Sequence, residues 1–128
     1  MGKKRLLIID DSLVDREILA YMLESKYETD EAENGFEGIE KLMTKENHYD
    51  LVLLDLHMPI LDGFHVLELM KENRLNKIPV IIITADSTEV NIFKTMQYKV
   101  ADFICKPYDE KVIMPRIESV LLLSEVGG

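Results

Sequence analysis

Five polar residues stand where short apolar runs of the sequence end: Asp10, Asp11, Asp55, Thr84 and Lys106. Three carboxylates brought together repel one another unless a cation lies between them. Carboxylate oxygens suit a hard ion, and Mg²⁺ is the natural candidate. An aspartate beside Mg²⁺ and an ammonium group can attack a phosphoryl group, because both cations neutralise charge on the transferring oxygens. The Thr84 hydroxyl could then donate a hydrogen bond to the phosphoryl product.

Each of these residues also has a purely structural interpretation. Lys106-Pro107 could be an ordinary turn, and residues 58–63 an ordinary loop. Two sets of residues could cap the first and fourth helices, namely Asp10, Asp11 or Ser12, and Thr84, Asp86 or Ser87. Asp55 is harder to explain in this way, because an acidic residue directly after four aliphatic ones is unusual without a use. The three histidines, His48, His57 and His65, show no spacing typical of metal ligands.

The apolar runs indicate the elements that must position these side chains. Residues 6–9, 51–54, 80–83 and 103–105 are continuously apolar, which is typical of parallel strands buried on both faces. Residues 27–33 are a more polar fifth candidate and are expected near an edge of the sheet.

Between these runs, apolar residues recur at helical spacing. We expect five helices whose core-facing residues are Val14, Ile18 and Met22; Phe36, Ile39 and Met43; Phe64, Leu67 and Met70; Val90, Phe93 and Met96; and Ile113, Ile117 and Val120. The order predicts an α/β fold, a flavodoxin-like, doubly wound (βα)5 sheet of five parallel strands with helices on both faces. In such a sheet the five polar residues meet at the carboxyl edge, where these folds bind ligands.

One residue disturbs the last helix. Pro115 lacks a backbone donor and clashes with the preceding turn, which costs about 3 kcal/mol in a regular helix interior. We therefore expect the last helix either to kink at Pro115 or to begin regular winding only near Met114.

Composition excludes several classes of protein. The 128 residues suffice for one domain, 47% of them are hydrophobic, and no apolar run approaches the roughly 20 residues of a membrane span. The N-terminus meets Asp10 too early for a signal peptide. A single cysteine, Cys105, excludes an internal disulfide and fits a reducing cytoplasm. The net charge of −9 argues against direct nucleic-acid binding.

Taken together, the motifs resemble the receiver domain of two-component response regulators, in particular chemotaxis-regulator-like ones. The resemblance spans essentially the whole chain as a single receiver domain, residues 1–128, with no output domain. It rests on segments 6–12, 55–59, 62–63, 84–85 and 102–108, which include Asp10-Asp11-Ser12, Asp62-Gly63 and Lys106-Pro107.

The resemblance implies a role for each position. Asp55 would be the phosphoacceptor. Lys106 would pair with Asp55 or its phosphate, and the Lys106-Pro107 peptide bond would be cis. Mg²⁺ would be held by Asp11 directly, by Asp10 mostly through water, and also by Asp55 and the backbone carbonyl of His57. Thr84 and Phe103 would form the switch, in which the hydroxyl moves toward the phosphate and the ring rotates inward.

The resemblance also implies partners. A histidine kinase or phosphotransfer protein would supply the phosphate, and the surface of the fourth helix, fifth strand and last helix would change for an unknown protein target or form a homodimer. The chain would catalyse only its own phosphorylation and dephosphorylation, and it would be no enzyme in the usual sense. It would act as a stand-alone regulator or as part of a larger regulator or hybrid kinase. His57 and Asp86 flank the site and should influence the lifetime of the phosphate.

Two positions depart from the family pattern, and three alternatives stay open. Lys99-Val100 stands where the family often has Gly-Ala, so the backbone there is expected to differ, and Pro115 lies on the expected partner face.

A phosphohydrolase like the haloacid dehalogenases would need a second Asp after Asp10-Asp11, spaced as Asp-x-Asp. A flavin-binding module would need a phosphate cradle in the first loop. A degenerate receiver that works without phosphate is disfavoured, since every expected site residue is present.

Overall fold

One parallel sheet forms the centre of the molecule in the computed structural model, which describes residues 2–127. Its strand order is β2-β1-β3-β4-β5, and every neighbouring pair is parallel. The strands are β1 (Lys4–Ile9), β2 (Tyr27–Ala32), β3 (Leu51–Leu54), β4 (Val80–Thr84) and β5 (Asp102–Cys105). The predicted doubly wound fold is confirmed, and the polar strand β2 lies at an edge as expected.

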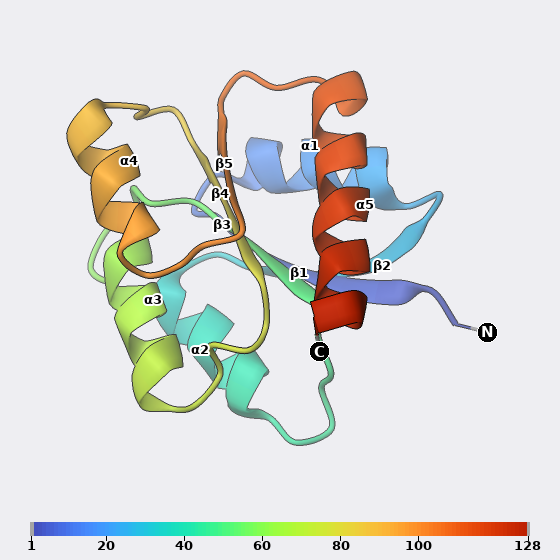
Figure 1. Ribbon diagram of the computed structural model, residues 1–128, viewed down its shortest axis with the longest axis horizontal. Coiled ribbons are helices and arrows are strands. Elements are labelled where there is room, and N and C mark those ends of the chain that lie inside the picture. Colours follow the sequence, from blue (N-terminus) through green and yellow to red (C-terminus); the bar gives the residue numbers. More distant parts are fainter. Residues whose placement is uncertain (1, 128) are drawn as a thin grey trace.

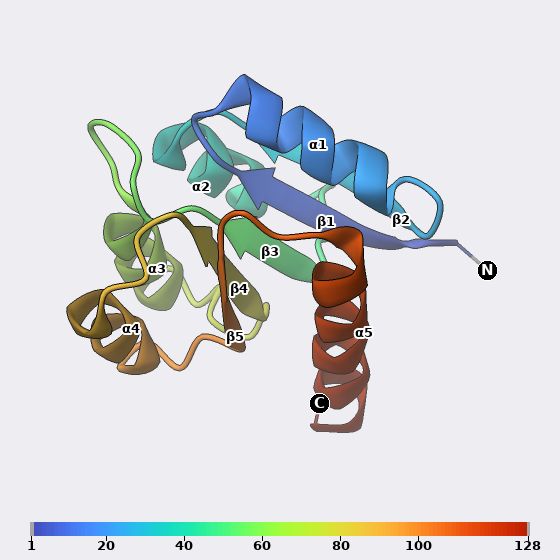
Figure 2. The ribbon, with the colours of Figure 1, turned by 90° about the horizontal axis from the view of Figure 1, so that it is seen from above.

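A helix follows each strand, and the helices cover both faces of the sheet. They are α1 (Leu13–Leu23), α2 (Gly35–Met43), α3 (Gly63–Glu72), α4 (Glu89–Met96) and α5 (Glu110–Gly127). Figures 1 and 2 show α3 and α4 together on one side of the sheet and α5 on the other. Within residues 2–127, no helix combines the length and the apolar character that crossing a membrane requires.

Two hydrophobic cores lie on opposite faces of the sheet. Leu6 and Ile8 of β1 point into a core with α1 and α5, whereas Leu7 and Ile9 point into a core with α2 and α3. Because alternate residues of a strand face opposite sides, both sets must be apolar. This explains why the strands appear in the sequence as continuous apolar runs.

Helical periodicity identified the core-facing side correctly for only two helices. In α3, Leu67 and Met70 are buried, and in α5, Ile113, Ile117 and Val120 are buried, as predicted.

The predicted core faces of α1 and α2 are correct only for Met22 and Ile39, which pack against the two cores, and the predicted core face of α4 is wrong. Seven residues assigned to them are exposed: Val14, Ile18, Phe36, Met43, Val90, Phe93 and Met96. Helix α1 instead buries Leu19 and Leu23, and α2 packs through its glycines. A Cβ on Gly38 would lie 2.5 Å from Ile9 Cδ1. In α2, close packing against the sheet therefore selects the side with small residues, which a search for large apolar residues overlooks.

The helix ends resolve the alternatives for capping. Ser12 caps α1 by accepting from the Asp15 amide, which leaves Asp10 and Asp11 free for another role. Thr88 caps α4, so the capping interpretation of Thr84, Asp86 and Ser87 is wrong.

The structure bears on both departures from the family pattern. Helix α5 begins at Glu110 and contains Pro115, so a start near Met114 is wrong. Lys99 has a φ of 58°, the left-handed conformation that glycine favours. The loop before β5 thus takes a glycine-like shape despite the lysine.

Candidate functional site

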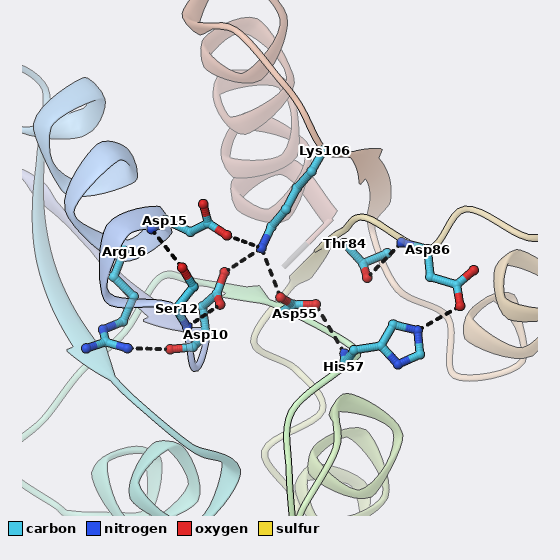
Figure 3. A network of polar contacts seen from close by, with 9 residues as sticks. All are labelled: Asp10, Ser12, Asp15, Arg16, Asp55, His57, Thr84, Asp86 and Lys106. Atoms are coloured by element: carbon cyan, nitrogen blue, oxygen red, sulfur yellow. Dashed lines mark hydrogen bonds and ion pairs between the residues drawn. The ribbon is translucent and has the colours of Figure 1, made fainter.

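The predicted site residues meet at the carboxyl edge of the sheet. Asp10 and Asp11 follow β1, Asp55 follows β3, Thr84 ends β4 and Lys106 follows β5. Figure 3 shows the Lys106 side chain reaching from the end of β5 to a point between Asp10 and Asp55. The convergence predicted from the sequence is therefore confirmed.

Three carboxylates form the acidic part of the site. One oxygen from each of Asp10, Asp11 and Asp55 lies within 4.8 Å of the other two. Asp10 and Asp55 are buried, whereas Asp11 is exposed. Burial raises the pKa of Asp10, against the hydrogen bonds from Ser12 and Lys106 that lower it. An all-oxygen donor set of this charge fits a hard divalent cation such as Mg²⁺.

Lys106 supplies the positive charge of the site. Its Nζ donates to Asp15 Oδ2 at 2.6 Å, to Asp10 Oδ2 at 2.9 Å and to Asp55 Oδ2 at 3.0 Å. Burial by itself would lower the pKa of Lys106, but these three hydrogen bonds outweigh it and raise the pKa. The Lys106–Pro107 peptide bond is cis, as expected.

Two residues of α1 complete this network, and sequence reasoning missed both. Asp15 pairs with Lys106, and the buried Arg16 donates from Nη1 to the Asp10 carbonyl at 2.6 Å and from Nε to Glu31 at 3.1 Å. Both lie in the first turn after the Asp10-Asp11 pair, so their position next to the sheet edge was a usable signal. Charged residues are common in the first turn of a helix, however, so the residue types of Asp15 and Arg16 did not by themselves indicate a role in the site.

A second set of contacts lies on the other side of Asp55 (Figure 3). The His57 amide donates to Asp55 Oδ1 at 3.1 Å, and its Nε2 lies 2.8 Å from Asp86 Oδ2. The Asp86 amide donates to the buried Thr84 hydroxyl at 3.3 Å. Hydrogen bonds from Thr88 and His57 lower the pKa of Asp86. Residues 57 and 86 thus join the β3–α3 and β4–α4 loops beside the site.

The predicted switch residues lie on neighbouring strands. Thr84 is fully buried at the end of β4, and Phe103 on β5 is partly buried against the α2–α3 core. Ile82 of β4 pairs in register with Phe103. Helix α4, which precedes β5 in the chain, exposes Val90, Phe93 and Met96. Cys105 is an exposed free thiol next to Lys106.

Comparisons with known proteins agree with this geometry. Residues 6–118 match the family described as the response regulator receiver domain. The transcriptional regulatory protein ResD of Bacillus subtilis is 36% identical over 121 residues, covering 94% of this chain and 49% of ResD. SrrA of Staphylococcus aureus is 31% identical, covering 94% of this chain and 48% of SrrA. The chain thus spans about half the length of these curated relatives.

Solved structures show the same fold. A CheY-like receiver domain protein from Methanospirillum hungatei superimposes with a TM-score of 0.90 at 25% identity, over 99% of this chain and 100% of that one. The receiver domain of a histidine kinase from Syntrophus aciditrophicus gives a TM-score of 0.82 at 30% identity, over 93% and 90% of the two chains.

Proposed function

This chain belongs to the response regulator receiver domain family, the phosphate-accepting switches of two-component systems, and we propose that Asp55 is its phosphoacceptor. One observation carries the proposal. Asp55 is a buried carboxylate that lies beside two other carboxylates and shares the Lys106 ammonium with Asp10. A buried acidic group in contact with a fixed cation is positioned to attack phosphorus.

The proposed reaction is in-line transfer of a phosphoryl group. An Asp55 oxygen forms a bond to the phosphorus of a phosphohistidine on a histidine kinase or phosphotransfer protein. The P–N bond breaks, and its electron pair stays on the imidazole nitrogen, which takes a proton from solvent. Lys106 stabilises the charge on the equatorial oxygens.

The donor set of the site fits Mg²⁺. Asp10, Asp11, Asp55 and the His57 carbonyl would hold the ion, and when bound it would neutralise charge on the transferring oxygens.

The proposed switch couples the new phosphate to the far edge of the sheet. Phosphorylation adds roughly −1.5 to −2 charge beside Lys106. The Thr84 hydroxyl then donates to a phosphate oxygen, and Phe103 moves into the vacated space. Both residues lie on adjacent strands, so the change reaches the surface formed by α4, β5 and α5.

We infer that this α4–β5–α5 surface is read by another protein or by a second copy of the chain. Val90, Phe93 and Met96 expose apolar area there, and the net charge of −9 opposes direct contact with nucleic acid. We propose residues 1–128 to be one receiver domain that acts in the cytoplasm and catalyses only its own phosphorylation and dephosphorylation. Its relatives are named transcriptional regulators, so a partner or a linked output domain would contact DNA.

The proposal is tested by incubating the protein with acetyl phosphate and Mg²⁺ and measuring its intact mass. We expect one phosphoryl group on the wild type and none on Asp55→Asn or in EDTA. Equal labelling of wild type and Asp55→Asn would contradict the assignment. Steady turnover of small phosphate esters would instead indicate a phosphohydrolase.

A further inference from the structure

All three N–H donors of the Lys106 ammonium are already used. An ammonium group has three N–H donors and no acceptor. Asp15, Asp10 and Asp55 each accept one of them, at 2.6, 2.9 and 3.0 Å. Lys106 therefore has no free donor for an incoming phosphoryl oxygen, and one carboxylate must release it before it can stabilise the transfer.

The surroundings of the three carboxylates decide which one gives way. The Asp10 side chain is 3% exposed and that of Asp55 is 9% exposed, whereas the Asp15 side chain is 33% exposed. A buried carboxylate that loses its cation pays a large desolvation penalty, but a partly exposed one regains water. Asp15 is thus the acceptor whose release costs least.

Asp15 also changes the charge that a phosphate donor meets. Asp15 pairs with the same lysine as Asp10 and Asp55, so the cluster carries one more negative charge than it would without Asp15. An anionic donor is repelled by this charge, while a divalent cation is attracted by it.

We propose that Asp15 is a displaceable counter-ion of Lys106, which holds the ammonium in the resting state and exchanges it for a phosphoryl oxygen during transfer. The inference rests on the proposed function of Asp55. It makes Asp15 a positioning residue, since it acts on the reaction through Lys106. In the resting protein Asp15 slows phosphorylation and strengthens the binding of the cation.

The test compares Asp15→Asn with the wild type. At saturating Mg²⁺, Asp15→Asn should be phosphorylated by acetyl phosphate about two- to five-fold faster, the range expected for loss of a partly exposed ion pair. Its Mg²⁺ dissociation constant, measured by calorimetry without any phosphate donor, should rise. A general structural defect would weaken Mg²⁺ binding and slow phosphorylation together, so the opposite signs identify the proposed role.

Two further variants make the test specific. Glu17→Gln removes the same charge from an exposed position on the same helix, and it should leave both quantities unchanged. Asp15→Glu should restore the slower, wild-type-like rate. If the wild type is labelled on Asp55 but Asp15→Asn is phosphorylated no faster than Glu17→Gln, this inference is overturned and the proposed function is not. Labelling that survives Asp55→Asn would overturn the proposed function instead.

Discussion

At the scale of single residues, Arg16 is the buried cation that fixes the end of β1. Its Nη1 donates to the Asp10 carbonyl at 2.6 Å, and its Nε pairs with Glu31 on the neighbouring strand. The side chain therefore ties α1 to the peptide that carries two of the predicted Mg²⁺ ligands.

We expect Arg16→Met to lower the free energy of unfolding by about 1–3 kcal/mol, because it leaves a buried carbonyl without its charged donor. Urea denaturation measures the change. Arg116→Met is the matched control, since its contact with Asp102 is 3.7 Å long and the side chain is 47% exposed. The control should cost no more than about 0.5 kcal/mol. Equal losses in the two variants would show that Arg16 has no special structural role.

The sequence predicted which residues meet at the sheet edge, but it did not predict the neighbours that contact them. Asp10, Asp55, Thr84 and Lys106 were predictable because each ends a strand, and parallel strands bring their ends to one edge. Asp15 was not predicted because a first-turn acidic residue already has an ordinary explanation, a favourable interaction with the helix dipole. Its contact with Lys106 joins residues 91 positions apart, which local patterns do not encode.

At the scale of elements, the start of α3 lies unusually close to the end of β3. A Cβ on Gly63 would lie 2.7 Å from both the Asp55 carbonyl oxygen and Leu56 Cα. The Gly63 amide also donates to the Leu56 carbonyl at 2.8 Å. The Asp62-Gly63 pair thus allows α3 to begin directly against the strand that positions Asp55, the proposed phosphoacceptor.

Gly63→Ala should therefore destabilise the protein by about 1–3 kcal/mol, since backbone atoms must shift to make room. The same shift displaces Asp55, so phosphorylation by acetyl phosphate should slow as well. Gly35→Ala is the comparison, because the atoms nearest its added Cβ belong to the side chains of Leu61 and Val66, at 2.8 Å. Side chains shift more readily than backbone, so we expect a smaller loss than for Gly63→Ala. Thermal denaturation and labelling rates check both variants.

Element types and order were predictable from the sequence, but the orientation of some helices was not. Apolar runs located four of the five strands, because a strand buried on both faces admits few polar residues, and the more polar β2 was expected at an edge of the sheet. Helix α4 shows where this reasoning fails, since Val90, Phe93 and Met96 keep helical spacing and yet remain exposed. An apolar stripe indicates that something covers it, and in a signalling domain that partner can be another molecule.

At the scale of the whole molecule, the site joins four of the five strands through their ends. A cation held by Asp10, Asp11 and Asp55 would link the ends of β1 and β3, and global unfolding would release it. Binding to the folded state alone adds stability according to ligand concentration.

We expect Mg²⁺ at about ten times its dissociation constant to add about 1.4 kcal/mol of stability, visible as a melting temperature several degrees higher than in EDTA. Asp10→Asn should lose this increase. In EDTA the variant should be at least as stable as the wild type, because burial raises the pKa of Asp10 and so disfavours its charged form. Glu17→Gln should keep the full increase. If the melting temperature of the wild type is the same in Mg²⁺ and in EDTA, the result would argue against a cation site.

The long reach of Lys106 has a consequence for a chain that is still being made. Its partners Asp10, Asp15 and Asp55 precede it by 96, 91 and 51 residues. During synthesis from the N-terminus, the carboxylates leave the ribosome long before their cation does. Until β5 has added to the edge of the sheet, Asp55 has no ammonium beside it. The proposed phosphoryl transfer to Asp55 therefore needs a fold that is complete through β5.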